Sequence, residues 1–518
     1  MTLQAQYDQA VAAHRRGEFE EAERLYRRLL EAAPSSATAR HMLGVLRAQS
    51  GDTTEALDLI GAALTLKPDA SDILFNYARV LKGVGRLDEA LTAYDRALTV
   101  KPDYAAARDA RAEALNLKGN SLREAGQAAQ ALSFYDRALT DAPRYPDALN
   151  NRAVALWSLG RFDEALAGSD AALALKPDYV EAHYNRGNVL RDLLRLEEAK
   201  QSFDRAIVLD PAFAPAHRNK AFCALLQGDF AQGLPLYEWR KRLNPPIEAR
   251  SYPQPLWTGA EDLKAKTVFV YIEQGLGDTI QFYRFVTPLL ARGARVILSV
   301  QDSLLRLLEH ARPRVELIGS RTVPPAFDYH IPLMSLPLAL ELTPGSIPDP
   351  GRTLEPDALK TEEWAARIGK KGFKIGISWQ GARGGVTSRA MPLDCFQGLS
   401  RIPGVRLISL QKDFGAEQRA GRLWVEGLEG LDDGADAFVD TAAVIANLDL
   451  VITLDSAVAH LAGALRCPVW VALKQVPDWR WFLGRDDSPW YSSMRLFRQT
   501  KDGDWDGVFA EMESQVPQ

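Results

Sequence analysis

The sequence predicts an α-helical solenoid followed by an α/β half with two parallel-sheet lobes. The first observation behind this prediction is a proline that recurs through the first half of the chain. Successive prolines are 34 residues apart, except for one interval of 41, and they stand at Pro34, Pro68, Pro102, Pro143, Pro177, Pro211 and Pro245. The second observation is a change of pattern after Pro245, where apolar, β-branched runs alternate with helix-period segments. Such alternation is typical of a parallel sheet.

Length, charge and cysteine content limit the class of protein. A chain of 518 residues is too long for one core, so two or three domains are expected. The net charge of -5 provides no basic surface for nucleic acid or for an anionic membrane. The first twenty residues carry several charges, no apolar run is long enough to span a membrane, and the three cysteines are far apart. We therefore expect a cytoplasmic protein without membrane insertion.

A second series of residues runs in phase with the prolines. Glycine, replaced once by leucine, stands at Gly17, Gly51, Gly85, Gly126, Gly160, Leu194 and Gly228, and a small residue follows five positions after each. A period of 34 residues with these positions is typical of the tetratricopeptide helix-turn-helix repeat. The sequence thus predicts seven repeats over residues 1–245. The seven extra residues near Gly119 predict one lengthened helix pair.

Asparagine recurs on the first helix of several repeats, nine residues before the turn. These residues, which we call the asparagine ladder, are Asn76, Asn151, Asn185 and Asn219. Equivalent positions of a solenoid point the same way, and an amide both donates and accepts hydrogen bonds. The ladder can therefore bind the backbone of an extended polypeptide acceptor. The alternative is that the asparagines serve contacts between repeats.

The α/β half follows a proline-rich linker over residues 246–262. Val268–Ile272 and Val296–Val300 are expected to be strands of a short first lobe, over residues 263–365, with a helix from Thr279 to Arg292 between them. Residues 309–356 show no regular pattern. The second lobe, over residues 366–518, has apolar runs at 374–379, 405–410 and 450–454, and a last strand at 469–473. A ligand cleft between the lobes is expected.

Two strand–loop–helix segments are candidate ligand loops. In the first, Gly275 and Gly277 permit a tight turn, and Asp278 and Thr279 are good N-cap residues. In the second, a strand ends at Leu454 and Asp455, Ser456 and Ala457 open a helix that contains His460. A helix start favours anions, so both segments suit phosphate groups. Each has a structural alternative, since a glycine pair can simply turn the chain and His460 can be a core histidine.

With these motifs in view, the α/β half resembles the heptosyltransferase-type glycosyltransferases of the GT-B arrangement. The resemblance rests on the segments 273–281, 455–463, 468–470, 477–481 and 488–491. Bacterial proteins of this type join such a domain to tetratricopeptide repeats, and the pairing is similar to that of protein O-linked sugar transferases. The resemblance implies a nucleotide-sugar donor as substrate, no metal and no cofactor.

The resemblance also implies roles for individual residues. Asp278 matches the proposed catalytic base. The helix that begins at Ser456, together with Lys412 and Arg389, would neutralise the departing diphosphate. Trp379 and Gln411, at strand ends, would line the nucleotide pocket. The tryptophans at 479, 481, 490 and 505 would either stack on a sugar or dock the C-terminal segment.

Taken together, the sequence predicts a metal-independent glycosyltransferase whose solenoid selects a protein acceptor, such as flagellin or another surface protein. Two alternatives stay open. The α/β half can be an inactive part of a scaffold, or the acceptor can be a glycan or a lipid-linked sugar.

Overall fold

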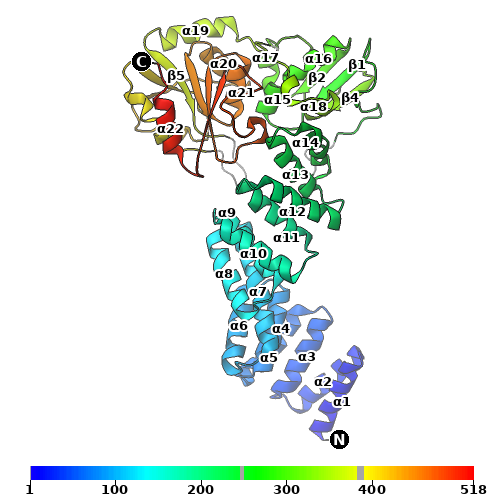
Figure 1. Cartoon of the computed structure of the whole chain (residues 1–518). Helices are drawn as coiled ribbons and strands as arrows, with labels where there is room; N and C mark the ends of the chain where they lie inside the picture. Colours follow the sequence, from blue (N-terminus) through cyan, green and yellow to red (C-terminus); the bar gives the residue numbers. More distant parts are fainter. Residues whose placement is uncertain (1, 246–249, 350, 382–389, 413, 518) are drawn as a thin grey trace. The chain divides into compact units, whose positions relative to one another are not determined.

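The protein forms two compact units, Met1–Leu193 and Leu194–Gln518. The structure is a computed structural model that describes residues 2–245, 250–349, 351–381, 390–412 and 414–517. The first unit is built from helices alone, whereas the second combines helices with two parallel sheets (Figure 1). The last helices of the repeat half thus belong to the same unit as the sheets, although the sequence pattern changes only at residue 245.

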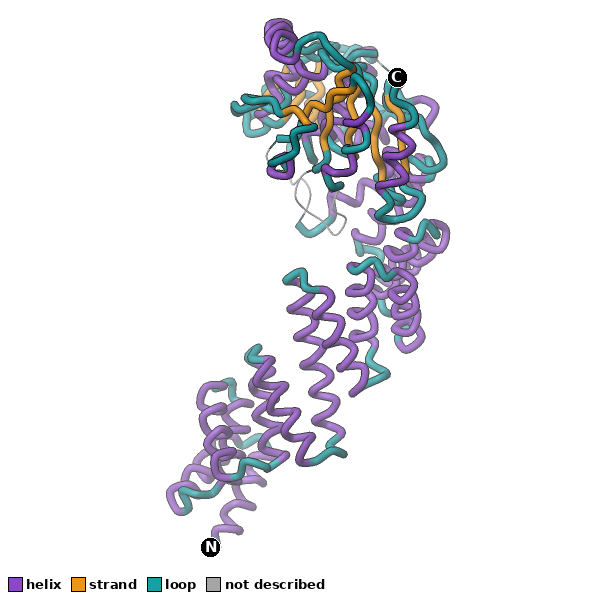
Figure 2. Tube along the Cα trace, turned by 90° about the vertical axis from the view of Figure 1, so that its left-hand side faces the viewer, coloured by secondary structure: helices purple, strands orange, loops and turns teal. Residues whose placement is uncertain are grey.

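The repeat half consists of helices that follow one another in short-linked pairs (Figure 2). Seven such pairs are present, as the period predicts. The helices are α1 (Leu3–Arg15), α2 (Phe19–Ala32), α3 (Ala37–Gln49), α4 (Thr53–Leu66), α5 (Ser71–Gly83), α6 (Leu87–Val100), α7 (Ala105–Glu124), α8 (Ala128–Asp141), α9 (Pro146–Ser158), α10 (Phe162–Leu175), α11 (Val180–Asp192), α12 (Leu196–Leu209), α13 (Ala214–Leu226) and α14 (Phe230–Tyr237).

The turn inside each pair explains the glycine series. Each of the six turn glycines has a positive φ, from 73° at Gly160 to 88° at Gly51. Leu194 takes the same conformation with φ 58°, which costs a residue with a Cβ about 1 kcal/mol or more. The extra seven residues lengthen α7 to 20 residues, against 13 in α5 and α9, which confirms the predicted long pair.

Two further features hold the repeats together. The small residues that follow the turn, such as Ala22, Ala56 and Ala90, are fully buried and allow close helix packing, as expected. Ion pairs recur between residues 16 positions apart, which the sequence analysis did not predict. They are Arg111–Asp95, Arg152–Asp136 and Arg186–Asp170, each 2.6 Å, in the first unit and Lys220–Asp204, 2.5 Å, in the second.

The second unit contains a four-stranded sheet in the order β3-β2-β1-β4 and a six-stranded sheet in the order β10-β9-β8-β5-β6-β7. Every strand pairing in both sheets is parallel. The strands are β1 (Thr267–Tyr271), β2 (Arg295–Val300), β3 (Glu316–Gly319), β4 (Tyr329–Pro332), β5 (Phe373–Ser378), β6 (Val405–Ser409), β7 (Val425–Glu426), β8 (Leu450–Leu454), β9 (Val469–Leu473) and β10 (Met494–Arg498).

Helices flank both sheets (Figure 1). They are α15 (Leu276–Phe282), α16 (Val286–Ala291), α17 (Leu305–Leu308), α18 (Leu336–Ala339), α19 (Ala358–Ile368), α20 (Val439–Ile445), α21 (Ala457–Ala464) and α22 (Trp505–Glu513). One core cluster surrounds the six-stranded sheet and includes Ile375, Ile452 and Phe509. The strand order reverses between β1 and β4 in one sheet and between β5 and β8 in the other. Ligands of open parallel sheets bind beyond the strand ends at such points.

Several sequence-based boundaries are corrected. Residues 309–356 hold β3 and β4, which the sequence analysis missed because each strand has four residues and β4 includes a histidine and a proline. The last strand is β10 rather than β9, and two arginines mask its apolar pattern. The predicted helix from Thr279 starts earlier, at Leu276, and a 3-10 turn at Tyr283–Phe285 separates α15 from α16.

Candidate active site

Helices α15 and α21, which follow the central strands β1 and β8, pack directly on each other. A Cβ added at Gly277 would lie 3.1 Å from Ala457 Cα and 3.1 Å from His460 Cδ2. A side chain at this position would require these neighbours to move by a few tenths of an ångström, so glycine suits the close packing of the two helices. The two candidate ligand loops, which are about 180 residues apart in sequence, therefore meet at one junction between the two sheets.

Asp278 is held at this junction by two interactions. Its Oδ2 accepts a hydrogen bond from the backbone N–H of Gly275 (2.9 Å), and its Oδ1 accepts one from Arg480 Nη2 (2.5 Å). The Asp278 side chain is still 23% exposed. Since each carboxylate oxygen can accept more than one hydrogen bond, Asp278 can also accept one from a ligand hydroxyl.

Arg480 is the residue that orients Asp278, and the sequence analysis did not assign it a role. Its guanidinium also donates to Asp478 Oδ1 (2.8 Å) and to Gln281 Oε1 (2.9 Å). Burial by itself lowers the pKa of Arg480, but the two carboxylates, Asp478 and Asp278, outweigh it and raise the pKa above its ordinary value. Its position between tryptophans in the 477–481 motif was the available sequence signal.

The first loop differs from its predicted form. Helix α15 begins after Gly275, so Asp278 lies within its first turn and Thr279 further inside, and neither is the N-cap residue. The side chain of Thr279 is buried and donates to Gln301 Oε1 (2.9 Å). Neither Gly275 nor Gly277 has a positive φ, and Gly277 serves helix packing rather than a turn around a ligand. The prediction of a glycine turn with an Asp278–Thr279 cap is therefore wrong.

The second loop matches its predicted boundaries. Ser456 is the N-cap residue of α21, as expected, although its Oγ lies 3.1 Å from Thr453 Oγ1 and makes no bond to the backbone of the first turn. Asp455, Ser456 and Ala457 are half-buried. The start of α21 therefore keeps accessible surface at the strand end, where an anion is favoured by the helix dipole.

His460 lies below this surface. It is 5% exposed, its ring stacks on Trp481 with centroids 5.4 Å apart, and its Nδ1 is 3.3 Å from the hydroxyl of Tyr491. Burial raises the pKa of Tyr491 to about 12, so its hydroxyl stays protonated. The core alternative fits His460 better than a direct contact with nucleotide.

The tryptophans of the C-terminal segment are also packing residues. Trp479, Trp481 and Trp490 are at most 3% exposed, and Trp505 packs against the core of the six-stranded sheet. Of the two interpretations from the sequence, docking of the segment is the one that these positions favour.

Trp379 and Gln411 connect the ends of β5 and β6. Trp379 is fully buried, so its side chain offers no surface to a nucleotide, contrary to expectation. Gln411 Oε1 accepts hydrogen bonds from Ser378 Oγ (3.1 Å), Trp379 N (3.0 Å) and Gln380 N (3.0 Å). Its amide therefore ties the two strand ends together, while part of the residue faces a pocket.

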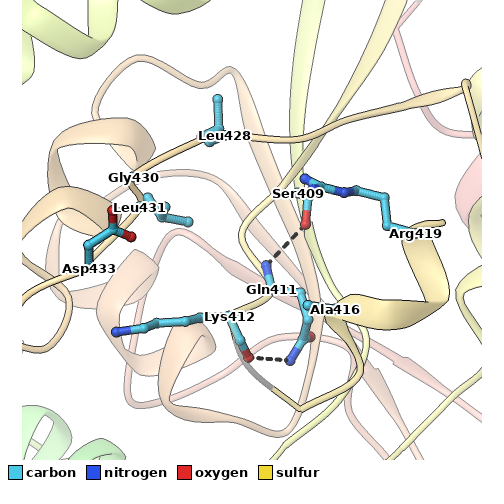
Figure 3. Close-up of a pocket in the computed structure, with 9 residues that line it drawn as sticks. All are labelled: Ser409, Gln411, Lys412, Ala416, Arg419, Leu428, Gly430, Leu431 and Asp433. Carbon is cyan, nitrogen blue, oxygen red and sulfur yellow. Dashed lines mark hydrogen bonds between the residues drawn. The ribbon is translucent and has the colours of Figure 1, made fainter.

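That pocket has a volume of about 150 Å³ and lies beyond the carboxyl ends of β6 and β7 (Figure 3). It is lined by Ser409, Gln411, Lys412, Ala416, Arg419, Leu428, Gly430, Leu431 and Asp433. The lining carries two positive charges, Lys412 and Arg419, and one carboxylate, Asp433. Lys412 Nζ also donates to the backbone oxygen of Asp432. Small-molecule sites usually exceed about 300 Å³, so this pocket is too small to enclose a complete ligand of that kind. Sequence analysis identified Lys412 but missed Arg419; Arg389 lies outside the described residues.

The asparagine ladder makes contacts between repeats. Asn151 Nδ2 donates to Asn116 Oδ1 and Asn185 Nδ2 to Asn150 Oδ1, each at 3.0 Å, and Asn76 Nδ2 lies 2.9 Å from His41 Nε2. Each contact spans 35 residues, so it joins neighbouring repeats. These three asparagines are half-buried, whereas Asn219 is 3% exposed and accepts from Arg218 Nε (3.3 Å). Asn76, Asn151 and Asn185 thus make the contacts between repeats that the alternative interpretation expects, and Asn219 is buried.

No helix among the described residues is long and apolar enough to cross a membrane. Within the same ranges, no group of three or more histidine, cysteine, aspartate or glutamate side chains is arranged to hold a metal ion.

Comparison with known proteins identifies the repeats. The tetratricopeptide repeat family matches residues 7–73, 47–114, 116–180 and 180–213, so the helix pairs within these ranges are tetratricopeptide repeats. Protein FlbA of Caulobacter vibrioides is 28% identical over 319 residues, which cover 55% of this chain and 52% of FlbA. The chain thus spans about half the length of this relative.

Two solved structures are similar to part of this chain. YrrB, described as a tetratricopeptide repeat protein with an unusual peptide-binding site, is 21% identical, with a TM-score of 0.32, over 38% of this chain and 97% of its own. PilF of Pseudomonas aeruginosa is 18% identical, with a TM-score of 0.32, over 42% of this chain and 96% of its own.

Proposed function

We propose that this protein is a glycosyltransferase that moves a sugar from a nucleotide-sugar donor to a polypeptide acceptor selected by the tetratricopeptide repeats. In this proposal the two parallel sheets are the two lobes of a GT-B arrangement, and the reaction needs no metal.

The observation that carries the proposal is the junction of α15 and α21. Each helix follows a strand at the reversal point of its own sheet, and Gly277 lies against Ala457. A transferase with two substrates needs groups from both sides of a cleft, one set for the acceptor and one for the donor. The junction brings Asp278 from one sheet to the half-buried start of α21 from the other.

The donor side of the proposal uses the six-stranded sheet. The start of α21 at Ser456 favours phosphate oxygens, and Lys412 and Arg419 add positive charge in the pocket beyond β6 and β7. Cations and a helix start can stabilise the departing diphosphate as its charge develops. Asp455 and Ala457 flank the same helix start.

The acceptor side uses Asp278. An acceptor hydroxyl donates its proton to the Asp278 carboxylate while its oxygen attacks the anomeric carbon of the sugar. The bond from that carbon to the diphosphate oxygen breaks, and the nucleoside diphosphate leaves with the electron pair. Arg480 fixes the orientation of the carboxylate throughout.

The donor site is tested by calorimetry with nucleoside diphosphates and nucleotide sugars. Lys412→Met and Arg419→Met should each weaken binding by about tenfold, because each removes one cation from the anion site. Lys370→Met, which changes an exposed lysine of the same lobe, should leave binding unchanged. Binding of no nucleotide by the wild type would refute the proposed function.

The catalytic role is tested with Asp278→Asn. The variant should lose at least about a hundredfold in kcat and keep its affinity for the donor, since a base acts on the acceptor in the transition state. Asp504→Asn, at the start of α22, is the matched control and should keep full activity. Full turnover by Asp278→Asn would show that another residue is the base. A wild-type protein that binds the donor but shows no turnover would favour the inactive scaffold. EDTA should leave the rate unchanged.

A further inference from the structure

The ligand crevice of the four-stranded sheet is occupied by the end of the repeat half. The strand order reverses between β1 and β4, and Glu273 and Ser335 follow these two strands. Arg240, in the 3-10 helix η1 (Glu238–Arg242), donates from Nη2 to Glu273 Oε2 (2.8 Å) and to Ser335 Oγ (2.7 Å). Its guanidinium therefore bridges the two strand ends where a ligand of this sheet would bind.

This bridge is a buried ionic network. Arg240 is fully buried and Glu273 is 1% exposed, and Glu238 accepts hydrogen bonds from Arg240 Nη1 (2.5 Å) and Lys241 Nζ (2.5 Å). Burial raises the pKa of Glu273 even though Arg240 opposes this shift. Buried ion pairs contribute little net stability because both partners lose their hydration. A network of this kind fixes one arrangement of the chain more than it stabilises the fold.

The next residue of the same loop is held as well. Gln274 Nε2 donates to the hydroxyl of Tyr237 (2.7 Å), the last residue of α14. Gly275 follows, and its N–H donates to Asp278. Two successive residues before the Asp278 helix are thus bound by the seventh repeat.

The seventh repeat is also connected to Asp278 through the segment that contains Arg480. The ring of Tyr237 packs against Trp479, with centroids 6.0 Å apart, and Phe230 of α14 packs against Trp479 and Phe482. Trp479 immediately precedes Arg480, which holds Asp278. Tyr237 therefore contacts both segments that fix the position of the carboxylate.

We propose that the seventh repeat is a positioning part of the active site: Arg240 fills the ligand crevice of the four-stranded sheet, and Tyr237 holds the loop that places Asp278. This inference rests on the proposed function and extends it. Because Arg240 lies at the reversal point where a free ligand of this sheet would bind, the acceptor of the proposed reaction is brought to the Asp278 junction instead.

The first test is Tyr237→Phe in the full-length protein, which removes only the hydroxyl bound to Gln274. Backbone amides of residues 273–278 should exchange hydrogen about fivefold faster, the effect of one lost hydrogen bond. The value of kcat should fall by about tenfold while the donor KM stays unchanged, because the donor pocket lies in the other lobe. Tyr135→Phe is the matched control, since it removes a buried hydroxyl that donates to the amide of Asn120 (2.8 Å) in the first unit. The control should change neither quantity.

The second test is the double variant Arg240→Met with Glu273→Gln, which removes both charges and leaves no buried ion unpaired. It should also speed exchange in residues 273–278 and lower kcat. Unchanged exchange in both Tyr237→Phe and the double variant would overturn the inference, as would faster exchange with wild-type kcat. Hydrogen exchange needs no substrate, so a wild-type protein that binds no nucleotide sugar would refute the proposed function without affecting the exchange result.

Discussion

Single residues at the α15–α21 junction have more than one role. Asp278 binds the backbone of its own helix and Arg480 at once, and Gly277 lets the two helices touch. A carboxylate held in this way is pre-oriented, and the proposed role as a base requires such an orientation. His460, by contrast, is a packing residue below the junction.

The role of His460 leads to a prediction about stability. His460→Ala should lower the free energy of unfolding of the second unit by about 2 to 4 kcal/mol, because it leaves a cavity beside Trp481 and removes the partner of Tyr491. Thermal unfolding followed by tryptophan fluorescence measures the change. Nucleotide affinity, measured by calorimetry well below the unfolding temperature, should stay at the wild-type value. If His460→Ala has wild-type stability but binds nucleotide much more weakly, His460 is a residue of the donor site.

At the scale of elements, the repeats are joined by two periodic series of polar contacts. The ladder amides bridge neighbouring first helices, and the ion pairs between residues 16 positions apart link the first helix of one repeat to the second helix of the repeat before it. An amide nitrogen carries two hydrogens. A ladder residue that donates one of them to the neighbouring repeat therefore has a second hydrogen that can bind a peptide backbone.

The ladder can be tested by changing Asn76, Asn151 and Asn185 together to alanine. Each amide that contacts a peptide backbone contributes on the order of 1 kcal/mol net, so transfer to protein should fall steeply. Release of nucleotide in the absence of acceptor should not change, because it needs only the second unit. The matched control is Arg152→Met with Arg186→Met, which removes two ion pairs between repeats and no ladder amide. Equal losses of transfer in both variants would show that the ladder acts through the stability of the repeats, and no loss in the asparagine variant would favour a glycan acceptor.

At the scale of the whole molecule, the division into Met1–Leu193 and Leu194–Gln518 separates most of the repeats from the sheets. The division falls at Leu194, the one turn of the series where leucine replaces glycine. The second unit carries the junction, the pocket and the seventh repeat. Ligand binding and repeat stability are therefore expected to be separable properties.

Two compact units predict two unfolding transitions in calorimetry of the full chain. A nucleotide sugar at a hundred times its Kd should stabilise the second unit by about 2.7 kcal/mol and raise only that transition. The triple asparagine variant should shift only the unfolding transition of the first unit. A single transition that moves as a whole with ligand would contradict this prediction and show that the units unfold together.

The sequence by itself determined the helical repeats and the two-sheet class of this protein. Repeat periods and apolar runs are local patterns, and helix pairs and buried parallel strands follow from them directly. The loops that open at Gly275 and Ser456 were also visible, since a glycine or serine after an apolar run marks a strand end. Short strands such as β3 and β4 were missed because four residues give no clear period.

Only the tertiary structure decided which residues meet. Gly277 contacts Ala457, Asp278 pairs with Arg480, and Arg240 reaches Glu273 across distances along the chain that no local pattern encodes. Burial likewise depends on the complete fold, which is why Trp379 and His460, placed at a ligand site by their positions at strand and helix ends, proved to be core residues.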